Sequence, residues 1–258
     1  MTEEQRYVFD LKGWLLLAGV LDSNLLRDIR QKLEADVRIA GLGRSVYRTS
    51  LEAPANELVD HPAIVEILRE IIAPDPAPDV YGFRCESSFF VYRGYGQSGF
   101  QPAHRGPDEP PLCYQFCNGR IASGLTRVIW ELTDVIQSSG GTAILSGSHK
   151  AALPLPPVLQ KYDARLYEGY VCPAGSAVIM TESCWHYGVE WTDETQRRLA
   201  VFNCYNHYLS NFHKPTATPA LLAAMPPKRR SAFRDVWGFD SHRGVFNTAA
   251  AIDMELPR

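Results

Sequence analysis

The sequence predicts a mainly β domain with flanking helices, built as a helix-supported β-sandwich or jelly roll. Two helix-type segments come first, and a turn-rich break follows at Pro74-Asp75-Pro76-Ala77-Pro78. Short runs of strand-type composition, separated by Gly, Pro and Asn clusters, then continue to about residue 208. Helices that precede many short strands are typical of sheets with helices on their outer faces.

Helical patterns dominate the first part of the chain. The range 7–18 predicts a short helix, a break at Gly13 and a strand. Apolar residues recur with approximately helical spacing over 23–40. His61-Pro62 starts a further helix, whose apolar residues share one face.

The second part has the pattern of a β core. Six runs have the composition of strands: 79–83, 87–93, 126–133, 143–145, 177–180 and 198–205. The 258 residues, 45% of them apolar, are enough for one domain with a sizeable core. We expect a single domain over 1–258, with a helical part to about residue 75, a jelly-roll core over about 79–208 and a helical or irregular C-terminal tail.

Composition excludes several classes of protein. The net charge is −3 and the pI about 6.2, which excludes a general nucleic-acid-binding protein. No apolar run is long enough to span a bilayer, and the charged N-terminus lacks the apolar core of a signal peptide. The six cysteines contain no CxxC pair, so paired-cysteine zinc sites are not expected. We expect reduced thiols and a cytoplasmic protein with no membrane partner; its oligomeric state stays open.

Two of the seven histidines differ from the rest in context. His104 follows a glycine-rich stretch, Gly94 to Gly99, and His186 follows a turn and a predicted strand. Imidazole nitrogens suit Fe(II), and Arg197 stands eleven residues after His186, where the last predicted strand begins. The other histidines favour structural roles. His149, in a Gly-Ser-His-Lys loop, is expected to fix that loop by hydrogen bonds.

Four motifs stand in a specific order and spacing: Val128–Val135 with Gly140–Lys150, then Pro173–Val178, Trp185–Gly188 and Arg197-Arg198. Through them the chain from about Tyr7 to Tyr208 resembles the phytanoyl-CoA dioxygenase family of Fe(II)/2-oxoglutarate enzymes. The first motif looks like the family's central strand, turn and Pro-Gly-Ser-His-Lys loop, with Ser146 where proline is usual. The next two look like the approach to the distal iron ligand, and the last looks like the site of the arginine that holds 2-oxoglutarate.

The resemblance implies a double-stranded β-helix core of the jelly-roll or cupin-like kind. It implies His104 and His186 as metal ligands, with Fe(II), 2-oxoglutarate and O2 as cofactors. Arg197 would hold the distal carboxylate of 2-oxoglutarate; Arg198, which faces the other side of a strand, is the alternative. Trp130 occupies the place of a tryptophan that lines the cosubstrate pocket, although plain core packing explains it equally well.

The sequence departs from the family at Gly106. Residues 104 and 106 project to the same side of an extended segment, and the resemblance implies Asp or Glu at 106 to complete the iron site. Glycine cannot be a ligand. Fe(II)/2-oxoglutarate halogenases are recognised by Gly or Ala at this position, where a chloride binds iron directly, so the resemblance implies a halogenase with a halide site at Gly106.

Two alternatives stay open. A looped segment could bring Asp108 or Glu109 to the metal, and the enzyme would then be a hydroxylase. The domain could also be a non-catalytic binding protein on the same fold. Retention of His104, His186 and Arg197 together argues against loss of the site.

The sequence gives little information about the substrate. The resemblance implies a free small molecule in natural-product or antibiotic biosynthesis, and a nucleotide such as a deoxyadenosine phosphate is the first candidate. Arg105 could pair with a phosphate, and aromatic residues could stack on a base: Tyr114, Phe116 and Tyr187. No partner of nucleic-acid polymer type is expected.

Overall fold

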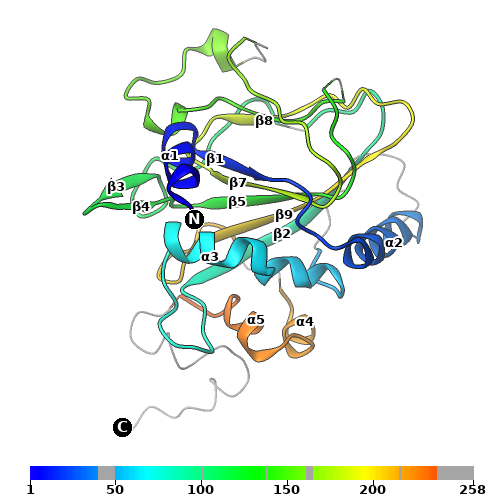
Figure 1. Cartoon of the computed structure of the whole chain (residues 1–258), viewed down its shortest axis with the longest axis horizontal. Coiled ribbons are helices and arrows are strands. Elements are labelled where there is room, and N and C mark those ends of the chain that lie inside the picture. The colour runs from blue at the N-terminus through cyan, green and yellow to red at the C-terminus, as the bar shows by residue number, and fades with distance from the viewer. Residues whose placement is uncertain (40–49, 100, 138, 161–164, 215–216, 237–258) are drawn as a thin grey trace.

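A five-stranded antiparallel sheet lies at the centre of the molecule, a computed structural model that describes residues 1–39, 50–99, 101–137, 139–160, 165–214 and 217–236 (Figure 1). Its strands run in the order β1 (Trp14–Leu17), β7 (Ser176–Thr181), β5 (Thr126–Glu131), β9 (Arg198–His207) and β2 (Phe83–Arg93). All four pairings are antiparallel, and the order of strands far apart in sequence is typical of a jelly roll.

A smaller layer faces this sheet. β6 (Gly141–Ile144) pairs with β8 (His186–Val189), and single bridges extend the pairing: His104 to His186 and Gln97 to Trp191. Figure 1 shows β8 on the opposite side of the large sheet from α3. The two layers form the two halves of a double-stranded β-helix, as the sequence predicts.

Helices cover the outer face of the large sheet. They are α1 (Glu3–Lys12), α2 (Ser23–Ile39), α3 (Pro62–Ile71), α4 (Pro219–Ala223) and α5 (Pro227–Ser231). Short 3-10 turns lie elsewhere in the chain, at Ala55–Asp60, Ser148–Lys150 and Pro157–Gln160. The hairpin of β3 (Gln115–Cys117) and β4 (Arg120–Ala122) projects from the side. Within the described ranges, every helix is too short or too polar to cross a bilayer.

Local chemistry explains where these helices begin and end. Thr2 and Gln5 form a capping box at the start of α1, and Gly13 ends it in the left-handed region at φ 82°. The His61 side chain caps α3 by accepting a hydrogen bond from the Ala63 N–H. The helices predicted at 23–40 and from His61 are thus confirmed. Ala40 and residues 237–258 of the predicted tail lie outside the described residues.

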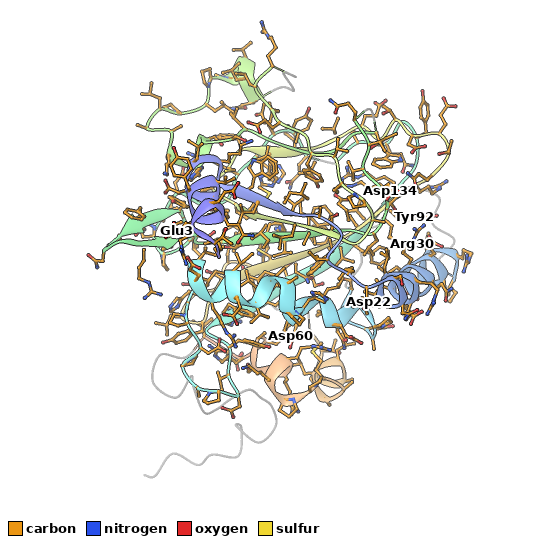
Figure 2. All side chains as sticks on the ribbon, in the orientation of Figure 1. Glu3, Asp22, Arg30, Asp60, Tyr92 and Asp134 are labelled. Atoms are coloured by element: carbon orange, nitrogen blue, oxygen red, sulfur yellow. The ribbon has the colours of Figure 1, made fainter. Side chains whose placement is uncertain are left out.

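Alternation along the strands separates two apolar cores. On β5, Val128 and Trp130 face the helices, whereas Ile129 faces the space between the two layers. On β9, Val201 faces the helices and Ala200 faces inward. Side chains occupy the space between the layers and the space under the helices (Figure 2). The inward faces of these strands therefore build the wall of any site inside the double-stranded β-helix.

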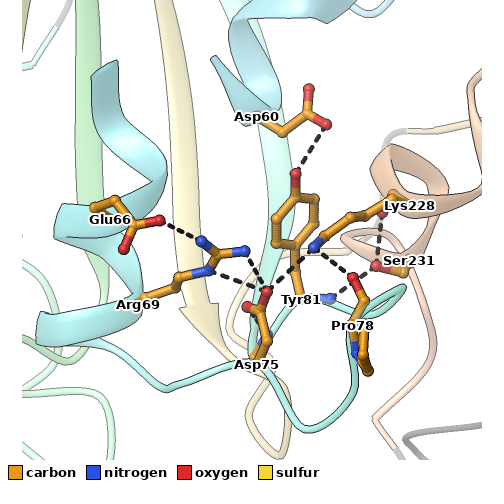
Figure 3. Close-up of polar contacts among 9 residues, drawn as sticks. Asp60, Glu66, Arg69, Asp75, Pro78, Tyr81, Lys228 and Ser231 are labelled. Carbon is orange, nitrogen blue, oxygen red and sulfur yellow. Dashed lines mark hydrogen bonds and ion pairs between the residues drawn. The ribbon is translucent and has the colours of Figure 1, made fainter. Parts of the chain in front are cut away.

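A polar network fixes α5 to α3 and to the loop before β2 (Figure 3). Asp75 pairs with Arg69 of α3 at 2.5 Å and with Lys228 of α5 at 3.4 Å. The Tyr81 N–H donates to the Ser231 hydroxyl at 3.0 Å, and the Tyr81 hydroxyl donates to Asp60 at 3.2 Å. Segments far apart in sequence are held together on the outer face, away from the inward-facing strand residues.

Candidate metal and cosubstrate site

His104 and His186 lie side by side at the edge of the smaller layer. Their backbones exchange two hydrogen bonds, of 3.0 and 2.9 Å, and their ring centroids are 4.4 Å apart. The antiparallel bridge explains this approach, since residues directly opposite each other project to the same side of a sheet. The structure thus brings together the two histidines that sequence reasoning selected, 82 positions apart in the chain.

Both imidazoles are oriented by backbone carbonyl groups. His104 Nδ1 lies 2.9 Å from the Pro102 oxygen, and His186 Nδ1 lies 2.9 Å from the Cys184 oxygen. A carbonyl can only accept, so each Nδ1 carries the hydrogen and each neutral ring keeps a lone pair on Nε2. Burial lowers the pKa of His186 and so favours the neutral ring, although the Glu182 carboxylate acts in the opposite direction. Such backbone partners are typical of metal-binding histidines.

The histidines open on a cavity of about 620 Å³ between the two layers. Its wall combines inward-facing residues of the large sheet with residues of the smaller layer, among them Phe89, Arg93, Arg127, Ile129, Thr142, Met180, Glu182 and Phe202. A more open hollow of about 940 Å³ adjoins it, and Tyr187 and Gly188 line both. A small molecule could thus approach the histidines from the side of β8.

Glu182 is the carboxylate closest to the histidines in this wall. Its Oε2 lies 3.7 Å from His186 Nε2, and its Oε1 accepts a hydrogen bond of 2.6 Å from Arg127 Nε. Burial raises the pKa of this carboxyl, but the Arg127 guanidinium and the nearby imidazoles lower it to about 2. Sequence reasoning missed Glu182. Its position four residues before His186, directly after the strand β7, is the signal that could have found it.

Gly106 lies against this same residue. The Gly106 N–H donates to the Glu182 carbonyl at 2.7 Å, and a Cβ built on Gly106 would come within 2.9 Å of the Glu182 Cβ. Asp108 and Glu109, the other carboxylates weighed for this site, are exposed, and Asp108 pairs with Arg105 at 2.5 Å. Neither is among the residues that line the cavity.

The two arginines at the start of β9 face opposite ways. Arg197 is exposed, and its guanidinium lies 5.2 Å from the ring of Tyr92, which packs against the helix-side core. Figure 2 labels Tyr92 on the α2 side of the molecule. The structure does not bring Arg197 to the histidines, because the alternation of β9 turns it outward. Which of the two arginines holds 2-oxoglutarate stays a prediction, and Arg198, the alternative to Arg197, is the one that faces inward.

Arg198 lies inside the double-stranded β-helix and is fully buried. It pairs with Glu131, donates to the Thr142 hydroxyl at 3.0 Å and lies 5.7 Å over the ring of Phe202. Its Nη1 is buried and has no hydrogen-bond partner among the described residues. A buried guanidinium nitrogen without a partner is costly unless a ligand oxygen accepts from it.

Three further candidate residues lie away from the cavity. Trp130 packs in the helix-side core, edge-on to His61 at 5.3 Å, and so does not line the cavity. Tyr114 belongs to the same core and donates its hydroxyl to Asp10 of α1, and Phe116 is 64% exposed on the hairpin. None of the three reaches the histidines, because each lies on the far side of the large sheet or on the projecting hairpin.

Arg105 and Tyr187 do line the cavity, as proposed for substrate contacts. The guanidinium of Arg105 also lies 5.5 Å over the ring of Trp185. His149 has the structural role that its loop predicted: its Nε2 lies 3.0 Å from the Asp10 carbonyl oxygen.

A second group of potential ligands includes one residue that lines the cavity, His213. Among the described residues, one set of three has all its ligand atoms within 4.8 Å: Glu86, Cys204 and His213. The Glu86 oxygens already accept from the His213 ring at 3.0 Å and from the Phe212 N–H at 3.0 Å. Glu86 therefore fixes the segment 212–213, whose two residues line the cavity.

Comparisons with known proteins support the fold. Neither protein-family models nor curated protein sequences match the chain. Among solved structures, HygX from Streptomyces hygroscopicus with nickel and 2-oxoglutarate bound matches with a TM-score of 0.70 and 19% identity, over 86% of this chain and 94% of HygX. HygX with nickel, 2-oxoglutarate and hygromycin B bound matches over the same shares with a TM-score of 0.65. The predicted fold is confirmed: the chain has the double-stranded β-helix fold of HygX.

Proposed function

We propose that the protein is an Fe(II)/2-oxoglutarate-dependent oxygenase that acts on a small-molecule natural product. One observation carries the proposal: two neighbouring imidazoles, each with Nδ1 held by a carbonyl, present Nε2 beside a cavity on this fold. His104 and His186 would hold Fe(II). Bound Fe(II), with 2-oxoglutarate and O2, supplies the oxidising power to remove hydrogen from an unactivated carbon. The protein binds and orients the substrate and restricts water through the apolar wall around the histidines.

Arg198 is the proposed anchor for 2-oxoglutarate, in place of Arg197. Its buried Nη1 has a donor hydrogen to offer, and Thr142, which lines the cavity, already accepts from its Nη2. The planar fork of a guanidinium suits a carboxylate. The Glu131 carboxylate holds the rest of the guanidinium in place.

Replacement of this anchor gives the first prediction. Arg198→Lys keeps a cation beside Glu131 but removes the planar fork, so we expect 2-oxoglutarate to bind about 10–100-fold more weakly. The matched control is Arg197→Lys, which should bind 2-oxoglutarate as the unaltered protein does. Titration of the metal-loaded protein under anaerobic conditions measures both. A loss in Arg197→Lys alone would return the anchor to position 197, and equal losses in the two variants would contradict a specific role for Arg198.

Halogenation is the second candidate outcome of the same chemistry. The glycine at 106, which leaves no side chain of its own at the metal, supports it. The product would then carry chlorine, and chloride would be a further cofactor bound at Gly106. Hydroxylation is supported by the nearby Glu182 carboxylate, since a third protein ligand there leaves less room for a halide.

For the substrate we propose an anionic or neutral small molecule, with a nucleotide such as a deoxyadenosine phosphate tested first. The cavity wall holds three arginines, Arg93, Arg105 and Arg127, and one carboxylate, Glu182. Such a wall suits anions better than a polycation. HygX has been crystallised with hygromycin B, so aminoglycosides form the comparison set in the screen.

One reconstitution tests the function. The protein is loaded anaerobically with Fe(II) and 2-oxoglutarate, and the iron–cosubstrate absorption band is recorded with and without chloride. We expect the band in the unaltered protein and its loss in His104→Gln and His186→Gln. Exposure to O2 with candidate substrates, followed by mass spectrometry, separates a gain of oxygen from a gain of chlorine. Absence of both metal binding and the band would show a non-catalytic protein.

A further inference from the structure

A side chain at position 106 and the side chain of Glu182 would compete for the same space. A side chain at 106 would begin 2.9 Å from the Glu182 Cβ, closer than real Cβ contacts come. The hydrogen bond from the Gly106 N–H to the Glu182 carbonyl, 2.7 Å long, ties the two backbones together. A carboxylate could therefore reach the histidines from position 106 or from position 182, but not from both without a shift of the chain.

The Glu182 carboxylate is aimed at the proposed metal position. Its Oε2 is 3.7 Å from His186 Nε2, whose lone pair is the proposed metal donor. Neighbouring ligand atoms of an octahedral ion with bonds of about 2.1 Å lie about 3 Å apart. The distance between Glu182 Oε2 and His186 Nε2 therefore exceeds the spacing of two ligands of one ion by less than about 1 Å. The ligand atoms of His104, His186 and Glu182 do not form a set within 4.8 Å among the described residues, so closure requires a rotation of the Glu182 side chain or a shift of His104.

Arg127 leaves this oxygen available. Its Nε donates to Oε1, on the side away from the His186 contact, and both side chains are nearly buried. Carboxylates that bind a metal are commonly held by a hydrogen bond to the other oxygen. The Arg127 charge also offsets the cost of burying the carboxylate.

We propose that Glu182 supplies the third protein ligand of the metal site, so that the carboxylate comes from the end of β7 instead of from position 106. This inference rests on the proposed function, because it needs His104 and His186 to bind the metal. It favours hydroxylation over chlorination, since the position that a halide would take is held by an oxygen of the protein.

Metal affinity without cosubstrate provides the test. Co(II) is titrated into the metal-free protein by calorimetry, and the visible Co(II) spectrum is recorded. Glu182→Gln keeps the size of the side chain but removes its charge, so we expect about 10–100-fold weaker Co(II) binding and a changed spectrum. The matched control is Glu131→Gln, which alters another buried glutamate–arginine pair. Because no 2-oxoglutarate is present in this titration, the control should leave Co(II) affinity unchanged. Equal Co(II) affinity in Glu182→Gln and in the unaltered protein would overturn the inference.

A second variant covers the case that Glu182→Gln does not fold. In Gly106→Asp/Glu182→Ala, the smaller residue at 182 makes room for a carboxylate at 106, and we expect Co(II) affinity above that of Glu182→Ala. No gain from Gly106→Asp in that background would count against a shared place for the two carboxylates. If the unaltered protein binds no Co(II), or if His104→Gln binds it equally well, the proposed function itself fails. That result differs from a failure at Glu182 alone.

Discussion

At position 106 the side chain is a hydrogen atom, and the neighbouring Glu182 explains why a larger one does not fit. The contact is with the Cβ of Glu182 and with its backbone, not with the mobile end of the side chain. The packing against Glu182 therefore favours glycine at position 106, independently of any metal that the histidines bind. A missing carboxylate in a sequence motif can reflect a carboxylate supplied from elsewhere in the fold.

Gly106→Ala gives a prediction at this scale. The added methyl group must displace Glu182, so we expect a loss of about 1–3 kcal/mol in the free energy of unfolding. Gly169→Ala is the control, because nothing lies within 4 Å of a Cβ built there and no unusual φ is recorded. Urea unfolding of the metal-free proteins measures both. Equal stability of the two variants would show that the site absorbs the methyl group without strain.

At the scale of the element, strand alternation decides which residues reach the site. One residue of difference at the start of β9 separates exposed Arg197 from buried Arg198. The same alternation on β5 turns Trp130 toward the helices and Ile129 toward the cavity. The spacing of eleven from His186 led to Arg197, but the register of β9 against β5 and β2 favours Arg198.

Trp130→Phe tests this placement on β5. The loss of ring volume in the helix-side core should cost about 1–3 kcal/mol of unfolding free energy, while 2-oxoglutarate affinity stays unchanged. Phe202→Leu, on the cavity side beneath Arg198, should instead change 2-oxoglutarate affinity. Urea unfolding and anaerobic titration separate the two effects. Weaker 2-oxoglutarate binding in a stable Trp130→Phe protein would place the indole at the cosubstrate.

At the scale of the whole molecule, Glu86 joins the large sheet to the segment that follows β9. The register of β2 against β9 shifts between Cys85 and Ser87, and the intervening Glu86 is fully buried where it meets Phe212 and His213. Burial raises the pKa of the Glu86 carboxyl, but hydrogen bonds from His213 and from the Phe212 backbone outweigh it, so the pKa lies below its usual value.

The lowered pKa of the Glu86 carboxyl predicts that stability depends on pH. A carboxyl with a lowered folded-state pKa stabilises the protein above its unfolded-state pKa, about 4.3, and that contribution is lost as the pH falls through the folded-state pKa. Glu86→Gln should therefore be less stable by about 1–3 kcal/mol at neutral pH, and the difference should shrink in acid. Urea unfolding of both proteins from about pH 7 to about pH 3 measures it. A difference that is constant with pH would show that the Glu86 charge is not responsible.

The sequence alone determined most of the order of helices and strands, because helical and strand periodicities are local properties. It did not predict the short strands β3, β4 and β8, and it divided β2 into two runs. It also predicted His104 and His186 as candidate metal ligands, because a glycine-rich approach and a turn after a strand mark them within short stretches of chain. Only the tertiary structure decided which other residues surround the two histidines. Which of two adjacent arginines faces inward depends on strand register, and the approach of Glu182 to Gly106 and His186 depends on the pairing of segments far apart in sequence. Such long-range contacts leave no local periodicity to read, and they are what make position 182 a candidate for the carboxylate that position 106 lacks.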